Sequence, residues 1–244
     1  MSHDQLAFMS LAILLVAFLY SSVGHAGASG YIAIMSLFGV AATVIRPAAL
    51  VLNILVATIA SWQFWRAGHF QFRLFWPFAV LAIPCAFLGG YIHLPTRMFQ
   101  VLVGAVLLFS AARFFAKPSD DTVRKEPSPW HAVPIGAGLG LLSGLTGTGG
   151  GIFLTPLLLF MRWARARQAA AVSAVFILAN SSAGLLGNVV STSSFPAFVV
   201  PFAVAAVLGG IAGSYLGSRR LPHQAIKRLL AVVLLIAGLK LLLT

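Results

Sequence analysis

The sequence predicts an all-α polytopic membrane protein of two inverted-topology repeats, each a glycine-broken helical hairpin followed by three transmembrane helices. Three observations support this prediction. Of the 244 residues, 60% are hydrophobic and only 8% are charged, too few to cover the surface of a soluble domain. The long apolar runs lack the alternation of barrel strands. The two halves also resemble each other, while their basic residues fall in non-corresponding loops.

The first half begins with a segment that small residues interrupt, SSVGHAGASGYIAIMSL at positions 21–37. A helix break is expected over residues 23–30, because glycine permits backbone angles that other residues avoid. Further apolar segments follow, among them the uncharged runs 78–88 and 99–110. With their flanks these runs reach the roughly 20 residues needed to cross a bilayer. Residues 1–116 are therefore expected to form the first repeat.

A hydrophilic stretch, KPSDDTVRKEPSP, separates the halves and holds three of the four acidic residues. It predicts a solvated linker at residues 117–129 and a second repeat at 130–244. The second half carries LSGLTGTGGGIFLTPLLL at positions 142–159, where two half-helices are expected to meet over residues 146–151. Three apolar segments follow, the last of them around residues 229–239.

The repeat can be followed residue by residue. Four residues of the first half match four of the second in one register: Ser22 with Ser143, Gly30 with Gly151, Arg46 with Arg167 and Val51 with Val172. After a gap the match resumes, with Gly90 against Gly217. The two matched arginines each open the helix after the break, as boundary residues or as ligand contacts, and the sequence leaves both readings open.

The basic residues predict the orientation in the membrane. If each broken hairpin enters and leaves on one side, every Lys and Arg except Arg46, Arg97 and Lys240 lies on one face. If the broken segments crossed once, the basic residues would divide almost evenly. The positive-inside rule favours the first arrangement, with both termini outside, the linker inside and an inverted relation between the repeats.

The two breaks predict an anion site. Broken backbone at membrane depth is tolerated only where protein buries it or where it lines a wet cavity. Helices restarting at Gly150 or Gly151, and at Gly30, would point free N–H groups into the breaks, although tight helix packing is the competing explanation. The expected substrate-binding residues are His25, Gly27, Ser29, Gly30, Asn53, Thr146, Gly147, Gly149, Gly150, Gly151 and Asn180.

Several classes of function are disfavoured. All acidic residues lie outside the predicted spans: Asp4, Asp120, Asp121 and Glu126. Cation carriers usually keep an intramembrane carboxylate, so an anionic substrate is favoured, and no metal or other cofactor is expected. The single cysteine, Cys85, and the few histidines suggest no nucleophile–base pair, so no enzymatic activity is expected. The net charge of +12 lies mostly between spans, which argues against a nucleic-acid partner.

The second break carries a recognisable motif, G-x-G-G-G-x-x-x-x-P over residues 147–156, followed by an arginine-opened helix, ARQAAAVSAVFILANSSAG. Together with the two glycine-broken halves, it resembles the sulfite exporter TauE/SafE family, also called the toluene-sulfonate uptake permeases. The resemblance covers nearly the whole chain. It implies ATP-independent transport of sulfite, sulfonates or related small sulfur-containing anions across a bacterial cytoplasmic (inner) membrane.

The expected function is a secondary transporter working as an exporter. Anion export from a negative interior is downhill by about 2.3 kcal/mol per charge at 100 mV, whereas uptake would need coupling to protons, with His25 as the candidate proton carrier. An anion channel and a proton-coupled organosulfonate uptake permease are the alternatives, with a scaffold protein less favoured. The expected partners are a small anionic substrate and the lipid bilayer, and the sequence leaves a homodimer open.

Overall fold

The computed structural model describes residues 3–92, 127–192 and 199–220 continuously, with isolated residues between 95 and 112 and between 228 and 242. The helices of this part are α1 (His3–Ser21), α2 (Ala28–Leu37), α3 (Ala42–Arg66), α4 (Phe72–Tyr91), α6 (Pro129–Thr146), α7 (Gly151–Phe160), α8 (Ala166–Thr192) and α9 (Val200–Arg219). The all-α prediction is confirmed for the described residues. Helices α3, α4, α8 and α9 are long and apolar enough to cross a membrane.

Each half follows the same order: a long helix, a short helix and then two long helices. The predicted last segment of each half, and residues 117–126 of the linker, fall largely or wholly outside the described residues. The boundaries of the two repeats and of the linker therefore stay predictions.

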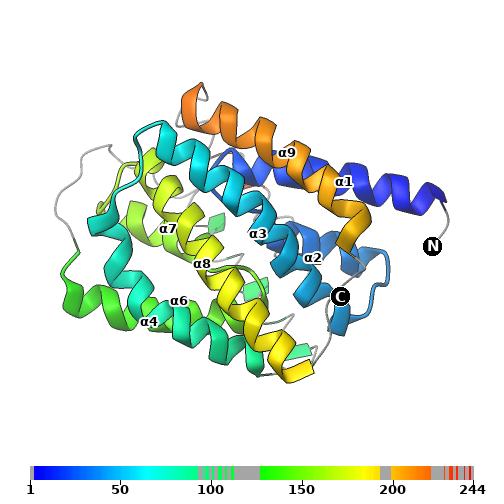
Figure 1. Ribbon diagram of the computed structural model, residues 1–244, viewed down its shortest axis with the longest axis horizontal. Coiled ribbons are helices and arrows are strands. Elements are labelled where there is room, and N and C mark those ends of the chain that lie inside the picture. The colour runs from blue at the N-terminus through cyan, green and yellow to red at the C-terminus, as the bar shows by residue number, and fades with distance from the viewer. Residues whose placement is uncertain are drawn as a thin grey trace.

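Helices α4 and α6 run in the same direction and pack closely. Glycines four residues apart on α6 face residues four apart on α4: Gly136 meets Phe78, Gly140 meets Ala82 and Gly144 meets Ala86. A side chain on any of these glycines would overlap with the main chain of α4. Helices α1 and α9 pair in the same manner, through glycines of α9 at positions 209, 213 and 217. Figure 1 shows the two pairs at opposite edges of the molecule.

Helices α3 and α8 run antiparallel through the middle, because Leu50 faces Gly184 while Asn53 bonds to Ser181. Helices α4, α6 and α8 therefore all begin at the end of the bundle where α3 finishes. Helix α9 finishes at that same end, since His69 of the α3–α4 loop bonds to its Ser218 carbonyl. The α6–α7 hairpin thus enters from that end, and the α1–α2 hairpin enters from the opposite one (Figure 1).

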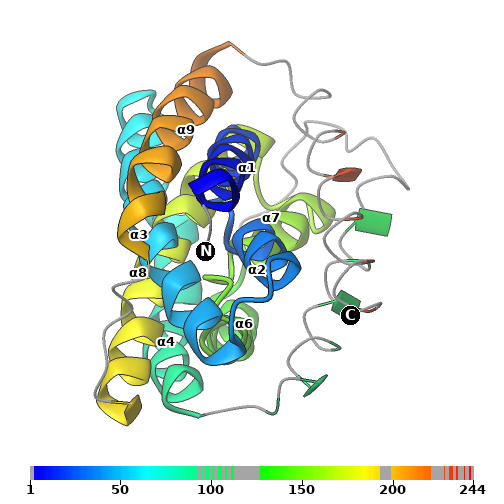
Figure 2. The same ribbon diagram turned by 90° about the vertical axis from the view of Figure 1, so that its right-hand side faces the viewer.

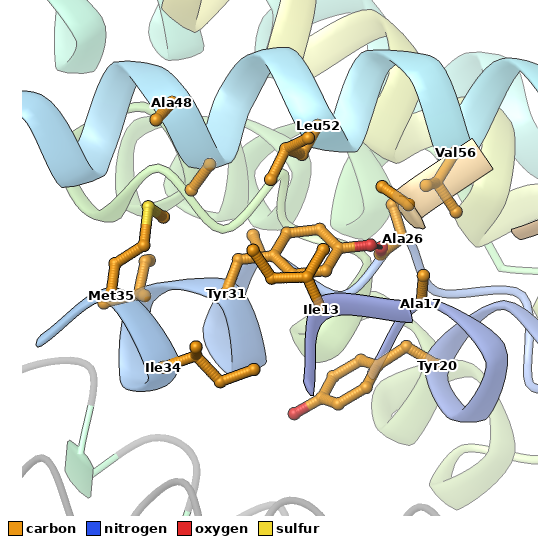
Figure 3. Close-up of a cluster of buried hydrophobic side chains, with 14 of the residues drawn as sticks. Ile13, Ala17, Tyr20, Ala26, Tyr31, Ile34, Met35, Ala48, Leu52 and Val56 are labelled. Carbon is orange, nitrogen blue, oxygen red and sulfur yellow. Dashed lines mark hydrogen bonds between the residues drawn. The ribbon is translucent and has the colours of Figure 1, made fainter. Parts of the chain in front are cut away.

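A cluster of buried apolar side chains fixes the first hairpin against α3 (Figure 3). Ile13 and Ala17 of α1, Tyr31 and Met35 of α2, and Leu52 of α3 have no exposed surface. In Figure 2 the short helices α2 and α7 lie between the α1/α9 pair and the α4/α6 pair. This packing holds the beginnings of both short helices inside the bundle.

The close contact between α4 and α6 predicts opposite effects for two glycines on one helix. Gly140→Ala should destabilise the protein by about 1–3 kcal/mol, because its methyl group would meet the Ala82 main chain. Gly138, two residues earlier, is exposed and has nothing within 4 Å of its Cβ position. Gly138→Ala should be neutral or stabilise by up to about 1 kcal/mol. Thermal unfolding of both variants in detergent measures this, and equal melting temperatures would contradict the packing.

Candidate functional site

The second break is a turn built by glycine between α6 and α7. Gly147 ends α6 at φ 73°, and Gly149 and Gly150 follow at φ 76° and 78°. All three lie in the left-handed region, where other L-residues are strained. The amides of Gly151 and Ile152 precede the first main-chain bonds of α7, which Phe153 and Leu154 make to Gly150. The break predicted over residues 146–151 is confirmed.

The first break lies between Ser21 and Ala28 and differs in one respect from the prediction. The residue preceding α2 is Gly27 at φ 104°, which corresponds to Gly150 before α7. The expected start of this helix at Gly30, matched with Gly151, is therefore wrong by two residues. Gly30 instead lies within the first turn of α2, where a Cβ would sit 2.5 Å from Val16 of α1. Helix packing, rather than chain reversal, requires glycine there.

The two breaks meet at His25. Its Nε2 lies 2.9 Å from the carbonyl oxygen of Gly151, and its side chain is 2% exposed. A carbonyl only accepts, so Nε2 carries the hydrogen and donates it. Nδ1 is buried with no hydrogen-bond partner among the described residues. His25 therefore links the first break directly to the start of α7.

Polar groups around the first break are otherwise paired within the same half. The Tyr20 and Ser29 hydroxyls lie 2.8 Å apart, and the Tyr31 hydroxyl donates to the Ala26 carbonyl at 2.6 Å. A Cβ on Gly27 would lie 2.9 Å from the Tyr31 ring. Two buried tyrosines thus fill the space around this break, and of the expected site residues here only His25 keeps an unpaired side-chain atom.

Several polar groups around the second break have no partner among the described residues. A Cβ on Gly149 would lie 2.7 Å from the Ser181 hydroxyl and 2.8 Å from Asn53 Nδ2. Asn53 Nδ2 donates to Ser181 at 3.3 Å, but Asn53 Oδ1 has no partner in the described part of the chain. The Ser143 hydroxyl, 3.4 Å from the Cβ position of Gly150, is also unpaired. These groups surround the turn that precedes α7.

Asn180 lies on the face of α8 that contacts this break. Phe176 and Ile177, one turn earlier, touch the Cβ positions of the break glycines, and Ser181 follows directly. Asn180 has no exposed surface, and neither its amide nitrogen nor its oxygen has a partner among the described residues. Unpaired buried polar atoms are uncommon in folded proteins and call for an explanation, such as a ligand or ordered water.

Thr146, another expected site residue, has its hydroxyl engaged by the turn. It donates to the Leu142 carbonyl at 2.6 Å and accepts from Thr148 at 2.8 Å. The hydroxyl hydrogen of Thr146 is therefore already donated within α6. Sequence reasoning missed Ser143 and did not count Ser181 among the site residues. The repeat had nonetheless signalled Ser143 through its match with Ser22.

Arg46 lies beside the second break, on α3. A Cβ on Gly147 would be 3.0 Å from its Cγ. Its two terminal nitrogens donate to three carbonyls at the end of α4, those of Gly89, Gly90 and Ile92, at 2.6–2.8 Å. The third nitrogen, Nε, is buried without a partner among the described residues. Arg46 therefore contacts the second break and also holds the end of α4, so it does more than mark the start of α3.

Comparison with known proteins assigns the chain to a family. The profile of the family described as "Sulfite exporter TauE/SafE" matches residues 9–241. The chain belongs to this family. A relative from Sinorhizobium fredii, named "Probable membrane transporter protein y4hK", is 42% identical over 240 residues, which cover 96% of this chain and 97% of the relative. No solved structure matches the chain.

Membership of the TauE/SafE family and the apolar helices make this chain a multi-pass membrane transporter. The family resemblance expected from the motif at residues 147–156 is confirmed. No group of three or more His, Cys, Asp or Glu side chains that could hold a metal ion occurs in the part of the TauE/SafE chain that the structure describes.

Proposed function

We propose that this protein is a secondary transporter that exports a small sulfur-containing anion, such as sulfite or an organosulfonate, across the bacterial cytoplasmic membrane. The observation that carries the proposal is the set of buried polar side chains with at least one unpaired atom near the start of α7: Asn53, Ser143 and Asn180. Asp4, at the start of α1, is the only acidic residue in the described part of the chain.

The chemistry of the second break suits an anion. The start of α7 offers the amides of Gly151 and Ile152 and about half a positive charge. The Asn180 amide and the Ser143 hydroxyl can each donate a hydrogen bond to an oxyanion. Hydrogen bonds to a charged partner contribute about 1.5–3 kcal/mol each, so a few suffice for selective binding.

The proposed site is asymmetric. The sequence suggested an anion shared by two helix starts, but the Tyr20 and Tyr31 hydroxyls are already engaged at the first break. We therefore assign the anion to the second break, with Gly147, Gly149, Gly150, Gly151, Thr146, Asn53 and Asn180 around it. The first break contributes His25 through its bond to Gly151, while Gly27 and Gly30 allow close packing against Val16 of α1 and Ser29 bonds to Tyr20.

The proposed orientation places the basic end of the bundle in the cytoplasm. That end carries most of the described basic residues: Arg66, Arg73, Arg162, Arg165, Arg167, Arg219 and Arg220. Arg46, near the start of α3, lies towards the other end. The positive-inside rule then puts the α6–α7 hairpin on the cytoplasmic side and the α1–α2 hairpin on the outer side, which is the arrangement of an inverted repeat. Rocking of the α1/α9 pair against the α4/α6 pair would open the second break first to one side of the membrane and then to the other.

Two other modes of transport are distinguishable. An anion channel would pass a current that does not saturate, and it would show no counterflow. A transporter shows saturable flux and counterflow. Proton-coupled uptake would respond to a pH gradient, with His25 as the residue that carries the proton. Flux of sulfite into and out of proteoliposomes, with and without internal sulfite and a pH gradient, separates the three.

The site itself is tested by a ligand panel and two glycine variants. Sulfite, sulfate, taurine, an aryl sulfonate, acetate and phosphate are compared by thermal shift, where a ligand at 100 times its Kd stabilises by about 2.7 kcal/mol. Gly150→Leu should lose this stabilisation, because its Cβ would press on Phe176 and Ser143 at 2.9 and 3.1 Å. Gly68→Leu, with φ 76° and open surroundings, controls for backbone strain and should respond like wild type.

Two outcomes would contradict the proposal. One is a wild-type protein that no anion in the panel stabilises. The other is a folded Gly150→Leu variant that keeps the wild-type response. If Gly150→Leu does not fold, Gly150→Ala introduces the same contact with a smaller side chain and is read in the same way.

A further inference from the structure

Arg46 stands apart from the other basic residues that the structure describes. It is 7% exposed, and no other described Lys or Arg is buried. The side chains that the structure describes include no Asp or Glu that could pair with it. Burying an unpaired charge costs several kcal/mol, so a buried guanidinium normally has a charged partner.

The partners that Arg46 does have account for only part of its charge. Three carbonyls at the end of α4 accept from its terminal nitrogens, and a helix end carries about half a negative charge. Its Nε hydrogen has no acceptor among the described residues. An arginine serving only to cap α4 would leave neither a buried donor unpaired nor a positive charge partly uncompensated.

The position of Arg46 connects it to the second break. Its Cγ touches the Cβ position of Gly147, and Asn53, two turns later on the same face of α3, touches that of Gly149. Continuing from Asn53 to Arg46, this face of α3 leads from the break towards the end of the bundle where α3 begins. That is the end opposite to Arg66.

We propose that Arg46 supplies the positive charge that selects an anion at the second break, with its Nε hydrogen donated to an oxygen of the bound anion. The proposal rests on the anion site proposed above and adds the residue that determines its charge preference. Arg46 then has two functions: its terminal nitrogens hold the end of α4, and its Nε binds the ligand. The bound anion completes the charge balance that α4 leaves incomplete.

The test measures sulfite affinity by titration calorimetry on the purified full chain. Arg46→Gln should bind sulfite at least tenfold more weakly than wild type, because a charge-assisted hydrogen bond is lost. Arg66→Gln, an exposed arginine at the other end of the same helix, is the matched control and should bind like wild type. Asn180→Leu changes another residue of the proposed anion site and should also weaken sulfite binding, which tests the site independently of Arg46.

A spectroscopic measurement keeps the test decisive if Arg46→Gln does not fold. Wild-type protein labelled with nitrogen-15 arginine gives an Nε signal for Arg46, which is assigned by its disappearance in Arg46→Lys. Sulfite should shift that signal. Sulfite binding with neither a shifted Nε signal nor weakened binding in a folded Arg46→Gln would overturn the role of Arg46 while leaving the anion site standing. No sulfite binding by wild type would instead remove the anion site itself.

Discussion

Replacing Asn180 by leucine should make the protein more stable and weaken its anion binding. Both polar atoms of this side chain are fully buried and unpaired among the described residues. An unsatisfied buried polar group costs about 1–3 kcal/mol, and leucine has the same branching of heavy atoms without that penalty. We expect Asn180→Leu to stabilise the ligand-free protein by about 1–3 kcal/mol, measured as a higher melting temperature in detergent.

The same change should remove a direct ligand contact. Losing one hydrogen bond to an anion costs about 1.5–3 kcal/mol, so sulfite affinity should fall by about tenfold to a hundredfold. The combination of higher stability with lost binding is expected at a functional site, where a polar group is kept despite its cost. A variant that damaged only the fold would lose both together.

Asn188, about two turns further along α8, provides the matched control. It is also buried, at 4% exposure, but its side chain has no buried unpaired atom. Asn188→Leu should therefore gain no stability and keep wild-type sulfite affinity. If Asn180→Leu instead lowered the melting temperature and bound sulfite normally, Asn180 would be a structural residue with a partner inside the protein, and the proposed site would lose its central contact.

The positions of the breaks could be predicted from the sequence because chain reversal depends on local chemistry. Three consecutive glycines at 149–151 have few other uses in an apolar segment, and two of them adopt left-handed angles. The residue at which α2 begins was harder to predict, because Gly24, Gly27 and Gly30 could each have formed the turn before it. Only Gly30 is required by packing against Val16 rather than by the turn, and that contact comes from another helix.

The asymmetry of the site could not be predicted, because it depends on tertiary partners. The sequence shows asparagines, serines and tyrosines but does not show which of them become paired. Tyr20 and Tyr31 bring hydroxyls that are engaged at the first break, at Ser29 and at the Ala26 carbonyl. Nothing equivalent satisfies Ser143 or Asn180 among the described residues. The matched halves therefore acquire different chemistry from their surroundings rather than from their own glycines.

Two substitutions of His25 should distinguish its hydrogen bond between the two halves from a role in proton transfer. His25→Leu removes the hydrogen bond to the Gly151 carbonyl at the start of α7. Leaving that buried carbonyl without this donor costs about 1–3 kcal/mol and releases the first residue of the helix that binds the anion. We expect His25→Leu to weaken sulfite binding about tenfold or more, and to slow sulfite efflux from proteoliposomes accordingly.

His25→Gln is the informative counterpart, because a glutamine amide can donate to the same carbonyl but cannot carry a proton. For an exporter driven by the membrane potential, His25→Gln should keep sulfite affinity and efflux within about threefold of wild type, the size of one modest hydrogen-bond difference. Neither protein should then respond to a pH gradient. Wild-type flux that follows the pH gradient, together with a His25→Gln variant that binds sulfite but no longer follows it, would establish proton-coupled transport instead. That outcome would make His25 the proton carrier, since Nδ1 is the unpaired atom that could take the proton while Nε2 keeps its bond to Gly151.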